Sequence, residues 1–304
     1  MMNSRQLLSS RKGFVLLSVL VLSTLLISCA TAFTWFVRTQ ARTISGERDA
    51  IAFRSMAQVL AEEVIKTLAI LGEHVNYDSK ATKIYQPFAI MPDENLGVWI
   101  VEVTPLDDKL PLRNLFLPDG NTLRREFDDV WQDMWEELEH RELEQKVLDF
   151  MDKNTRPRVG SIEQDWYINR PPYDMSELLM MSDDITPELL NELSTYCTIY
   201  SDGRINLNVA PLEVMKLLPG LDVGGLAEGI IRKRREEPLQ DFNDIQNIPG
   251  AGPKTATQLT NIATFKSRYF ELKIDSMTQS GEGGRTFRII FDRTTRQIVR
   301  WEEQ

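Results

Sequence analysis

Histidine and cysteine carry much of the nucleophilic and metal chemistry of proteins near neutral pH, and this chain of 304 residues has only two of each. His74 and His140 lie in unrelated polar surroundings, and neither stands at metal-ligand spacing from another strong ligand. Cys29 falls in an apolar run, whereas the distant Cys197 reads as a small buried apolar residue. The sequence contains no nucleophile elbow and no phosphate loop. We therefore expect that the protein is not an enzyme.

A different chemistry, phosphate binding, is suggested by the stretch NIPGAGPKTATQL (247–259), which matches a helix-hairpin-helix turn. Gly250 and Gly252 permit a tight turn between two helices. A degenerate sister copy at 217–238 keeps Gly220 but has Asp222 where a second glycine belongs. In DNA-binding examples, the backbone N–H groups of such a hairpin and the N-terminus of the next helix hold a phosphate.

The charge of this region argues against DNA binding. Seven acidic residues face six basic ones between residues 206 and 265, and the whole chain has a formal net charge of −10. Phosphate binding needs clustered positive charge. We therefore expect the hairpins to pack a small helical domain, and nucleic acid is not an expected partner. A membrane-anchored helix-hairpin-helix protein of a competence-type DNA uptake system is the alternative function.

The N-terminal segment decides in which compartment these elements lie. Residues 13–37 are uncharged, and as a helix they extend roughly 37 Å, enough to cross a hydrocarbon core of about 30 Å. Three basic residues precede the run, so the positive-inside rule places the N-terminus in the cytoplasm. A secretory signal would have a shorter apolar region. A lipoprotein processing box ending at Cys29 would be followed by polar residues, whereas residues 30–37 stay apolar. We expect a retained anchor.

The rest of the chain forms the elements outside the membrane. The helical pattern continues to Gly72 with a loose apolar stripe, and residues 96–105 alternate as a strand. Residues 121–265 show helical periodicity, including one stretch from 125 to 151, and residues 268–303 predict three antiparallel strands. One early strand and three late strands predict a sheet that is interrupted by an insertion. The fold class is therefore α+β.

The start of the chain resembles a known export signal. Lys12-Gly13-Phe14 followed by a long apolar helix is similar to the type III signal of prepilins and pseudopilins. In that family a membrane prepilin peptidase cuts after the glycine and methylates the new N-terminus. The resemblance implies cleavage between Gly13 and Phe14, and a helix that serves both as membrane anchor and as filament core.

Three further stretches resemble the K-type minor pseudopilin of type II secretion, the GspK family. They are VLDFMDKNTRPRVGSIEQDWYINRPPYDMSELLMM, RINLNVAPLEVMKLLPGL and IIRKRREEPLQDFNDI. The resemblance implies a pilin-like long N-terminal helix packed on a small antiparallel sheet, interrupted by a large inserted all-α domain with helix-hairpin-helix-like turns. It divides the chain into a cytoplasmic leader (1–13), a transmembrane segment (14–37), a pilin-like domain in two parts (38–118 and 266–304) and the inserted domain (119–265).

The resemblance also implies a position in the filament. Most pilins carry glutamate at mature position five, where Ser18 stands here, and that carboxylate is thought to neutralise the N-terminal amine of a neighbouring subunit. K-type subunits are similar in lacking it, which suits a subunit at the tip that initiates or caps the pseudopilus for export of folded proteins across the outer membrane. The implied partners are the I-type and J-type minor pseudopilins, the prepilin peptidase and the inner membrane, with the C-terminal domain in the periplasm.

Members of this family can bind calcium in the helical domain. Asp149, Asp152, Asn154 and Glu163 carry hard oxygen ligands of the type that calcium prefers. A solvated acidic loop without metal is the alternative interpretation. No cofactor is expected to be required.

Overall fold

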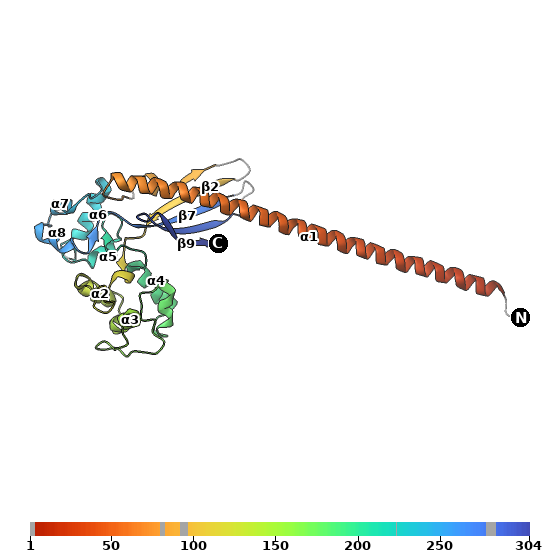
Figure 1. Cartoon of the computed structure of the whole chain (residues 1–304), viewed down its shortest axis with the longest axis horizontal. Helices are drawn as coiled ribbons and strands as arrows, with labels where there is room; N and C mark the ends of the chain where they lie inside the picture. The colour runs from red at the N-terminus through yellow and green to blue at the C-terminus, as the bar shows by residue number, and fades with distance from the viewer. Residues whose placement is uncertain (1–3, 80–82, 92–96, 223, 278–283) are drawn as a thin grey trace. The chain divides into compact units, whose positions relative to one another are not determined.

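The computed structural model describes residues 4–79, 83–91, 97–222, 224–277 and 284–304, with the backbone alone for residues 4–18, 45 and 83. Two compact units make up the chain, Met1–Gln58 and Val59–Gln304. Helix α1 (Ser4–His74) begins in the first unit and ends in the second. The described part of the first unit is helical throughout (Figure 1).

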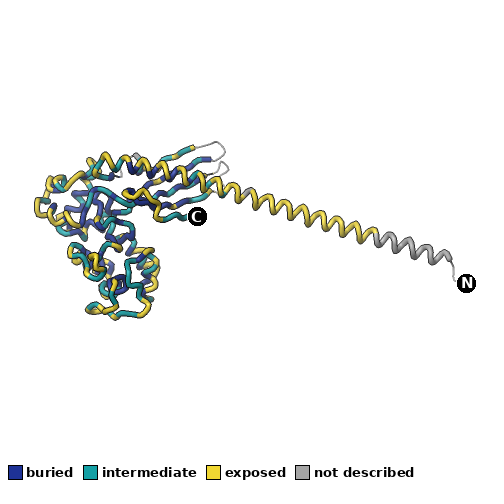
Figure 2. Tube along the Cα trace, in the orientation of Figure 1, coloured by how far each residue is buried: buried dark blue, intermediate teal, exposed yellow. Residues whose placement is uncertain are grey.

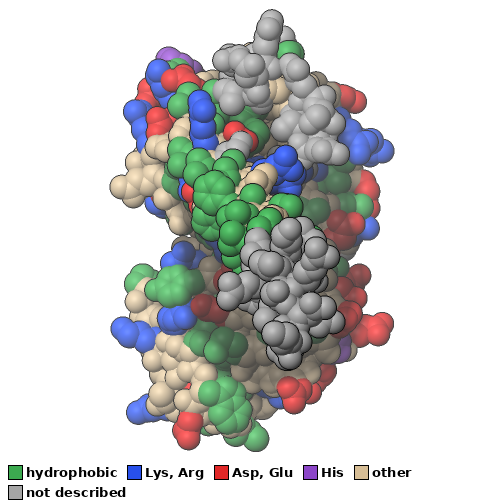
Figure 3. All heavy atoms as spheres, turned by 90° about the vertical axis from the view of Figure 1, so that its right-hand side faces the viewer, with side chains coloured by type: hydrophobic (Ala, Val, Ile, Leu, Met, Phe, Trp, Pro, Cys, Tyr) green, Lys and Arg blue, Asp and Glu red, His purple; other side chains and the backbone are tan. Residues whose placement is uncertain are grey.

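The first unit is exposed between Val19 and Val37 (Figure 2), and its large side chains there are mostly apolar. Figure 3, which views the molecule from the N-terminal side, shows hydrophobic side chains gathered on this face. The hydroxyl groups among them donate back along the helix, as from Ser23 to the carbonyl of Val19 and from Thr34 to the carbonyl of Ala30, both at 2.7 Å. Such bonds satisfy hydroxyl groups in surroundings without water. Among the described residues, Val19–His74 is the one helical stretch long and apolar enough to cross a membrane.

The second unit contains a five-stranded antiparallel sheet in the order β1-β2-β7-β8-β9. In β7, Phe270, Leu272 and Ile274 are buried and the residues between them are partly exposed. This period of two is expected of a sheet with one face on a core. The strands are β1 (Phe88–Ile90), β2 (Val98–Pro105), β7 (Tyr269–Met277), β8 (Thr286–Asp292) and β9 (Gln297–Glu303).

The last turns of α1 belong to this unit and run beside the sheet (Figure 1). Leu60, Val64 and Leu68 recur at steps of four and are buried, so α1 is amphipathic where it meets the sheet. Further along, a Cβ on Gly72 would lie 3.1 Å from the side chain of Arg293, which follows β8. The end of α1 is thus in close contact with the β8–β9 turn.

Between β2 and β7 in the sequence lies a helical region with its own hydrophobic core. Two parallel pairs of short strands, β3 with β4 and β5 with β6, join distant parts of it. Its helices are α2 (Arg125–Glu137), α3 (Glu144–Met151), α4 (Pro187–Tyr196), α5 (Leu212–Lys216), α6 (Leu226–Glu236), α7 (Phe242–Gln246) and α8 (Pro253–Leu259). Its strands are β3 (Leu110–Pro111), β4 (Cys197–Thr198), β5 (Ile205–Asn206) and β6 (Ala263–Thr264). Short 3-10 helices span Lys83–Tyr85, before β1, and Leu112–Asn114, Arg141–Leu143 and Met175–Met180 in the helical region.

The sequence pattern and the structure agree on the α+β class and differ in detail. The long N-terminal helix, the small antiparallel sheet and the interrupting helices are present as predicted. The periodic stretch 125–151 is not one helix, because Glu139 adopts a left-handed conformation (φ 58°) that ends α2 before α3 begins. The helical core includes Leu110 and Leu115, which the sequence assigned to the pilin-like part. Strand β1 was not predicted.

Candidate functional site

The residues of the predicted processing site lie near the start of α1. Gly13, Phe14 and Ser18 are helical in backbone, but their side chains fall outside the described residues. Cleavage after Gly13 and the tip-specific role of Ser18 therefore stay predictions. Cys29, on which the lipoprotein alternative depends, lies inside the same continuous helix with an exposed side chain.

Beyond the apolar run, the first unit presents an exposed apolar face. Ile44 is 62% exposed and Ile51 is 63% exposed. The two lie seven residues apart, so they share one face of the helix. Large aliphatic side chains exposed in a row on one helix face are suited to packing against another helix.

The predicted calcium ligands lie around the C-terminal end of α3. The carboxylates of Asp149 and Asp152 are fully buried. Asn154 donates from its side-chain amide to Asp152 at 2.9 Å. The backbone N–H of Arg158 donates to both oxygens of Asp149, at 2.9 and 3.0 Å, and its guanidinium Nε lies 3.0 Å from Asp152. Arg158, which the sequence analysis did not single out, is thus the cation that balances these two acids.

Glu163 adds a third carboxylate from the loop that follows. Both of its carboxylate oxygens are buried without a hydrogen bond of good geometry, although the side chain of Asn169 is close enough to stabilise their charge. Burial raises the pKa of Glu163, the side chain of Asn169 opposes that effect, and the negative charges of Asp149 and Asp152 raise the pKa further. Within the described ranges, no three His, Cys, Asp or Glu side chains have the spacing of a metal site. The structure brings the predicted ligands into one neighbourhood without arranging them as a coordination shell.

Both predicted hairpin turns are present. Gly220 (φ 78°) joins α5 to α6, and Gly250 (φ 90°) joins α7 to α8. A Cβ on Gly220 would lie 2.8 Å from the side chain of Gln258 on α8, and one on Gly250 would lie 3.2 Å from Leu226 on α6. Each turn therefore packs against the second helix of the other hairpin.

Gly252 does not play the role in the turn that the sequence assigned to it. Its φ of −164° is extended backbone that any residue adopts, and a Cβ there would meet nothing within 4 Å. The tight turn depends on Gly250, and Gly252 only precedes the first residue of α8.

Acidic side chains surround the first hairpin. The hollow beside Gly220 is lined by Asp129, Asp133 and Asp222 among others. The pKa of Asp133 is raised by burial and further by the charges of its acidic neighbours, which include Asp129 and Asp222. Four acids and one cation, Arg125, line this hollow, so the electrostatics disfavour a DNA phosphate at the first turn.

One connection that the sequence did not reveal holds both ends of the helical region. Asp107 follows β2, and its buried carboxylate accepts the backbone N–H groups of Asp202 at 2.8 Å, Arg268 at 2.8 Å and Tyr269 at 2.9 Å. The last two residues lie where the chain enters β7. No local pattern marks Asp107, because its partners are far away in the sequence.

Comparison with known proteins supports the fold assignment. One chain of the crystal structure of the GspK-GspI-GspJ complex from the type 2 secretion system of enterotoxigenic Escherichia coli matches with a TM-score of 0.68. The match covers 87% of this chain and 99% of that chain, at 16% sequence identity. No protein-family profile and no curated protein matches the sequence. The resemblance that the sequence motifs indicated is thus confirmed at the level of the fold, which is that of a component of this secretion complex.

Proposed function

We propose that this chain is a K-type minor pseudopilin that initiates or caps the pseudopilus of a type II secretion system, for export of folded proteins across the outer membrane. The observation that carries the proposal is the fold likeness over almost the whole length of a chain from the GspK-GspI-GspJ complex. The exposed apolar part of α1 supports it, because such a helix can anchor a subunit in the inner membrane before assembly. The protein then acts by assembly and not by catalysis.

In this proposal α1 makes the contacts that hold the complex together. The segment from Val19 to Val37 lies in the inner membrane before assembly and among the helices of other subunits afterwards. Its apolar side chains suit both environments, because both are apolar. The face of Ile44 and Ile51 continues that contact outside the lipid. I-type and J-type minor pseudopilins are the proposed partners, and the second unit lies in the periplasm.

The processing step can be tested by the intact mass of the mature protein. Mature chain that begins at methylated Phe14 is expected, with prepilin peptidase as the enzyme. Gly13→Lys should leave the precursor in the membrane, because bulk and charge would enter the peptidase site. Gly46→Lys is the matched control, since a side chain there meets nothing within 4 Å in the same helix. A mature N-terminus at Cys29 would establish the lipoprotein alternative.

The tip position can be tested by crosslinking from the helical region in assembled pseudopili. Ser18 offers no carboxylate to the amine of a subunit above it, so this subunit should occupy one end of the filament. Ser18→Glu should not improve assembly, because a subunit at the tip gains no partner for the new charge. Crosslinks that map along the filament shaft would contradict the tip position while leaving the pseudopilin proposal in place.

We also propose that the acidic cluster binds calcium. The buried carboxylate of Glu163, which lies close to the charges of Asp149 and Asp152, fits a hard divalent cation. The cation would have to replace the guanidinium of Arg158 at Asp152. Calcium should then raise the midpoint of thermal unfolding of the purified chain, since a ligand that binds only the folded state stabilises it. Glu163→Gln should abolish the rise, and Glu192→Gln, an exposed acid on α4, should not. An equal rise in both variants would refute the site.

A further inference from the structure

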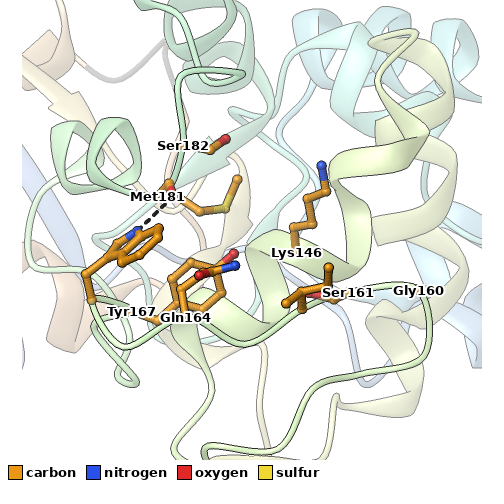
Figure 4. A pocket seen from close by; sticks show the side chains of 9 residues that line it. Lys146, Gly160, Ser161, Gln164, Tyr167, Met181 and Ser182 are labelled. Carbon is orange, nitrogen blue, oxygen red and sulfur yellow. Dashed lines mark hydrogen bonds between the residues drawn. The ribbon is translucent and has the colours of Figure 1, made fainter.

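The helical region contains a pocket of about 260 Å³ that the proposed assembly function does not use. Figure 4 shows Lys146 of α3 together with Gly160, Ser161, Gln164 and Tyr167 from the loop after α3, and Met181 with Ser182 from the segment before α4. Ile162 and Trp166 complete the lining. The pocket is large enough for one or two amino-acid side chains and far too small for a folded domain.

The apolar walls of the pocket are exposed and held in place. Ile162 is 73% exposed and Trp166 is 59% exposed. The indole N–H of Trp166 donates to the carbonyl of Met181 at 3.3 Å, which the dashed line in Figure 4 marks. Trp166 also meets the ring of Tyr167 edge-on at 6.4 Å. A fixed aromatic side chain that faces solvent is characteristic of the centre of a binding site.

Two polar groups in the lining lack strong partners. The hydroxyl of Ser161 is buried and makes no hydrogen bond to any residue that the structure describes. The ammonium of Lys146 lies 3.5 Å from the carboxylate of Asp184, and the side chain of Asp184 is exposed to solvent. An ion pair this exposed contributes little binding free energy. A carboxylate from a partner can therefore compete with Asp184 for Lys146.

We propose that this pocket docks an extended segment of a partner protein in which an acidic side chain stands next to an aromatic or aliphatic one. The carboxylate pairs with Lys146, and the apolar neighbour packs on Trp166 and Ile162. The side-chain amide of Gln164 bonds the backbone of the segment, whereas the buried hydroxyl of Ser161 is out of its reach. The choice of an acidic segment follows from charge, because Lys146 is the one ionised side chain of the lining. The site does not depend on the proposed place of the chain in a pseudopilus.

A random heptapeptide library displayed on phage tests this proposal with the full-length chain in lipid nanodiscs. Selection should enrich Asp or Glu beside an aromatic or aliphatic residue, after removal of phage that bind empty nanodiscs. Lys146→Glu should weaken binding of the selected peptides at least tenfold. Trp166→Ala should weaken it similarly, while Trp166→Phe should restore part of the affinity.

The matched control is Lys254→Glu, which makes the same charge change at an exposed lysine of α8, outside the pocket. It should leave the affinity unchanged. A second selection on Lys146→Glu should favour basic in place of acidic residues. The proposal is overturned if no peptide is enriched over empty nanodiscs, if the enriched peptides carry no acidic preference, or if Lys146→Glu and Lys254→Glu weaken binding equally.

Discussion

The ion pair between Asp78 and Arg293 offers a direct test of how burial sets the strength of the contacts that hold the second unit together. Two nitrogens of Arg293 lie 2.7 and 3.0 Å from the two oxygens of Asp78. The side chains are 6% and 0% exposed. The same carboxylate accepts a hydrogen bond from the hydroxyl of Tyr85 at 2.7 Å. The pair joins the segment after α1 to the end of β8.

Arg293→Met would leave the carboxylate of Asp78 charged and buried without its cation. Breaking a buried pair in this way costs about 3–5 kcal/mol, whereas an exposed pair contributes about 0–1 kcal/mol. The β8–β9 turn also supplies an exposed pair for comparison. A guanidinium nitrogen of Arg296 lies 2.7 Å from a carboxylate oxygen of Glu73, and the two side chains are 60% and 62% exposed. The shortest N–O distance is equal in the two pairs, so a difference between them reports the burial of Asp78–Arg293 together with its second N–O contact.

Denaturant unfolding of the full chain in detergent micelles, followed by near-ultraviolet circular dichroism, measures both effects. Two double-mutant cycles are needed, one with Asp78→Asn and Arg293→Met and one with Glu73→Gln and Arg296→Met. We expect a coupling energy of at least about 2 kcal/mol for the buried pair and below about 1 kcal/mol for the exposed one. Equal coupling in the two cycles would refute the assignment of Asp78–Arg293 as the tie that holds this end of the unit.

Three further predictions concern the junction, the helices and the assembly face. Burial raises the pKa of Asp107 to about 7, above its unfolded value, so the folded chain holds this proton more tightly. The free energy of unfolding should therefore fall as pH rises from about 4 to 7, by up to roughly 4 kcal/mol from this group. Asp107→Asn should remove this contribution to the pH dependence of stability, which unfolding measured at pH 5 and 7.5 checks. Glu139→Gly should raise the free energy of unfolding by about 1 kcal/mol, because glycine adopts a φ of 58° without strain. Gln132→Gly in the interior of α2 should lower it by a similar amount. Ile44→Ser combined with Ile51→Ser should reduce copurification of I-type and J-type partners, and Arg42→Ser with Asp49→Ser, at the same spacing on another face, should not; equal losses would contradict a specific apolar face.

The elements that the sequence predicts well are those with local periodic patterns. The apolar run and the loose apolar stripe that includes Leu60 and Leu68 predict α1, because burial on a helix repeats every three to four residues. The alternation of Phe270, Leu272 and Ile274 predicts β7 in the same way. The turn glycines Gly220 and Gly250 are recognisable because no other residue adopts a positive φ as readily.

The elements that the sequence does not predict depend on contacts between distant residues. Arg158 balances Asp149 and Asp152, but nothing in its local sequence distinguishes it from an exposed arginine. Asp107 is bonded to residues about a hundred and more positions away. Strand β1 has only three residues, too few for an alternating pattern to stand out.

The way in which the helical region joins the sheet determines what its surface can do. A region joined to a sheet by two chain crossings alone would be expected to move relative to it. Here Asp107, in the first crossing, accepts hydrogen bonds from Arg268 in the second crossing and from Asp202 in the helical region. In addition, Arg300 of β9 pairs with Asp174, which precedes the 3-10 helix Met175–Met180. That 3-10 helix leads directly to Met181 in the wall of the proposed docking pocket. The wall of the proposed pocket is therefore tied to β9 through the Arg300–Asp174 ion pair and the 3-10 helix that follows Asp174.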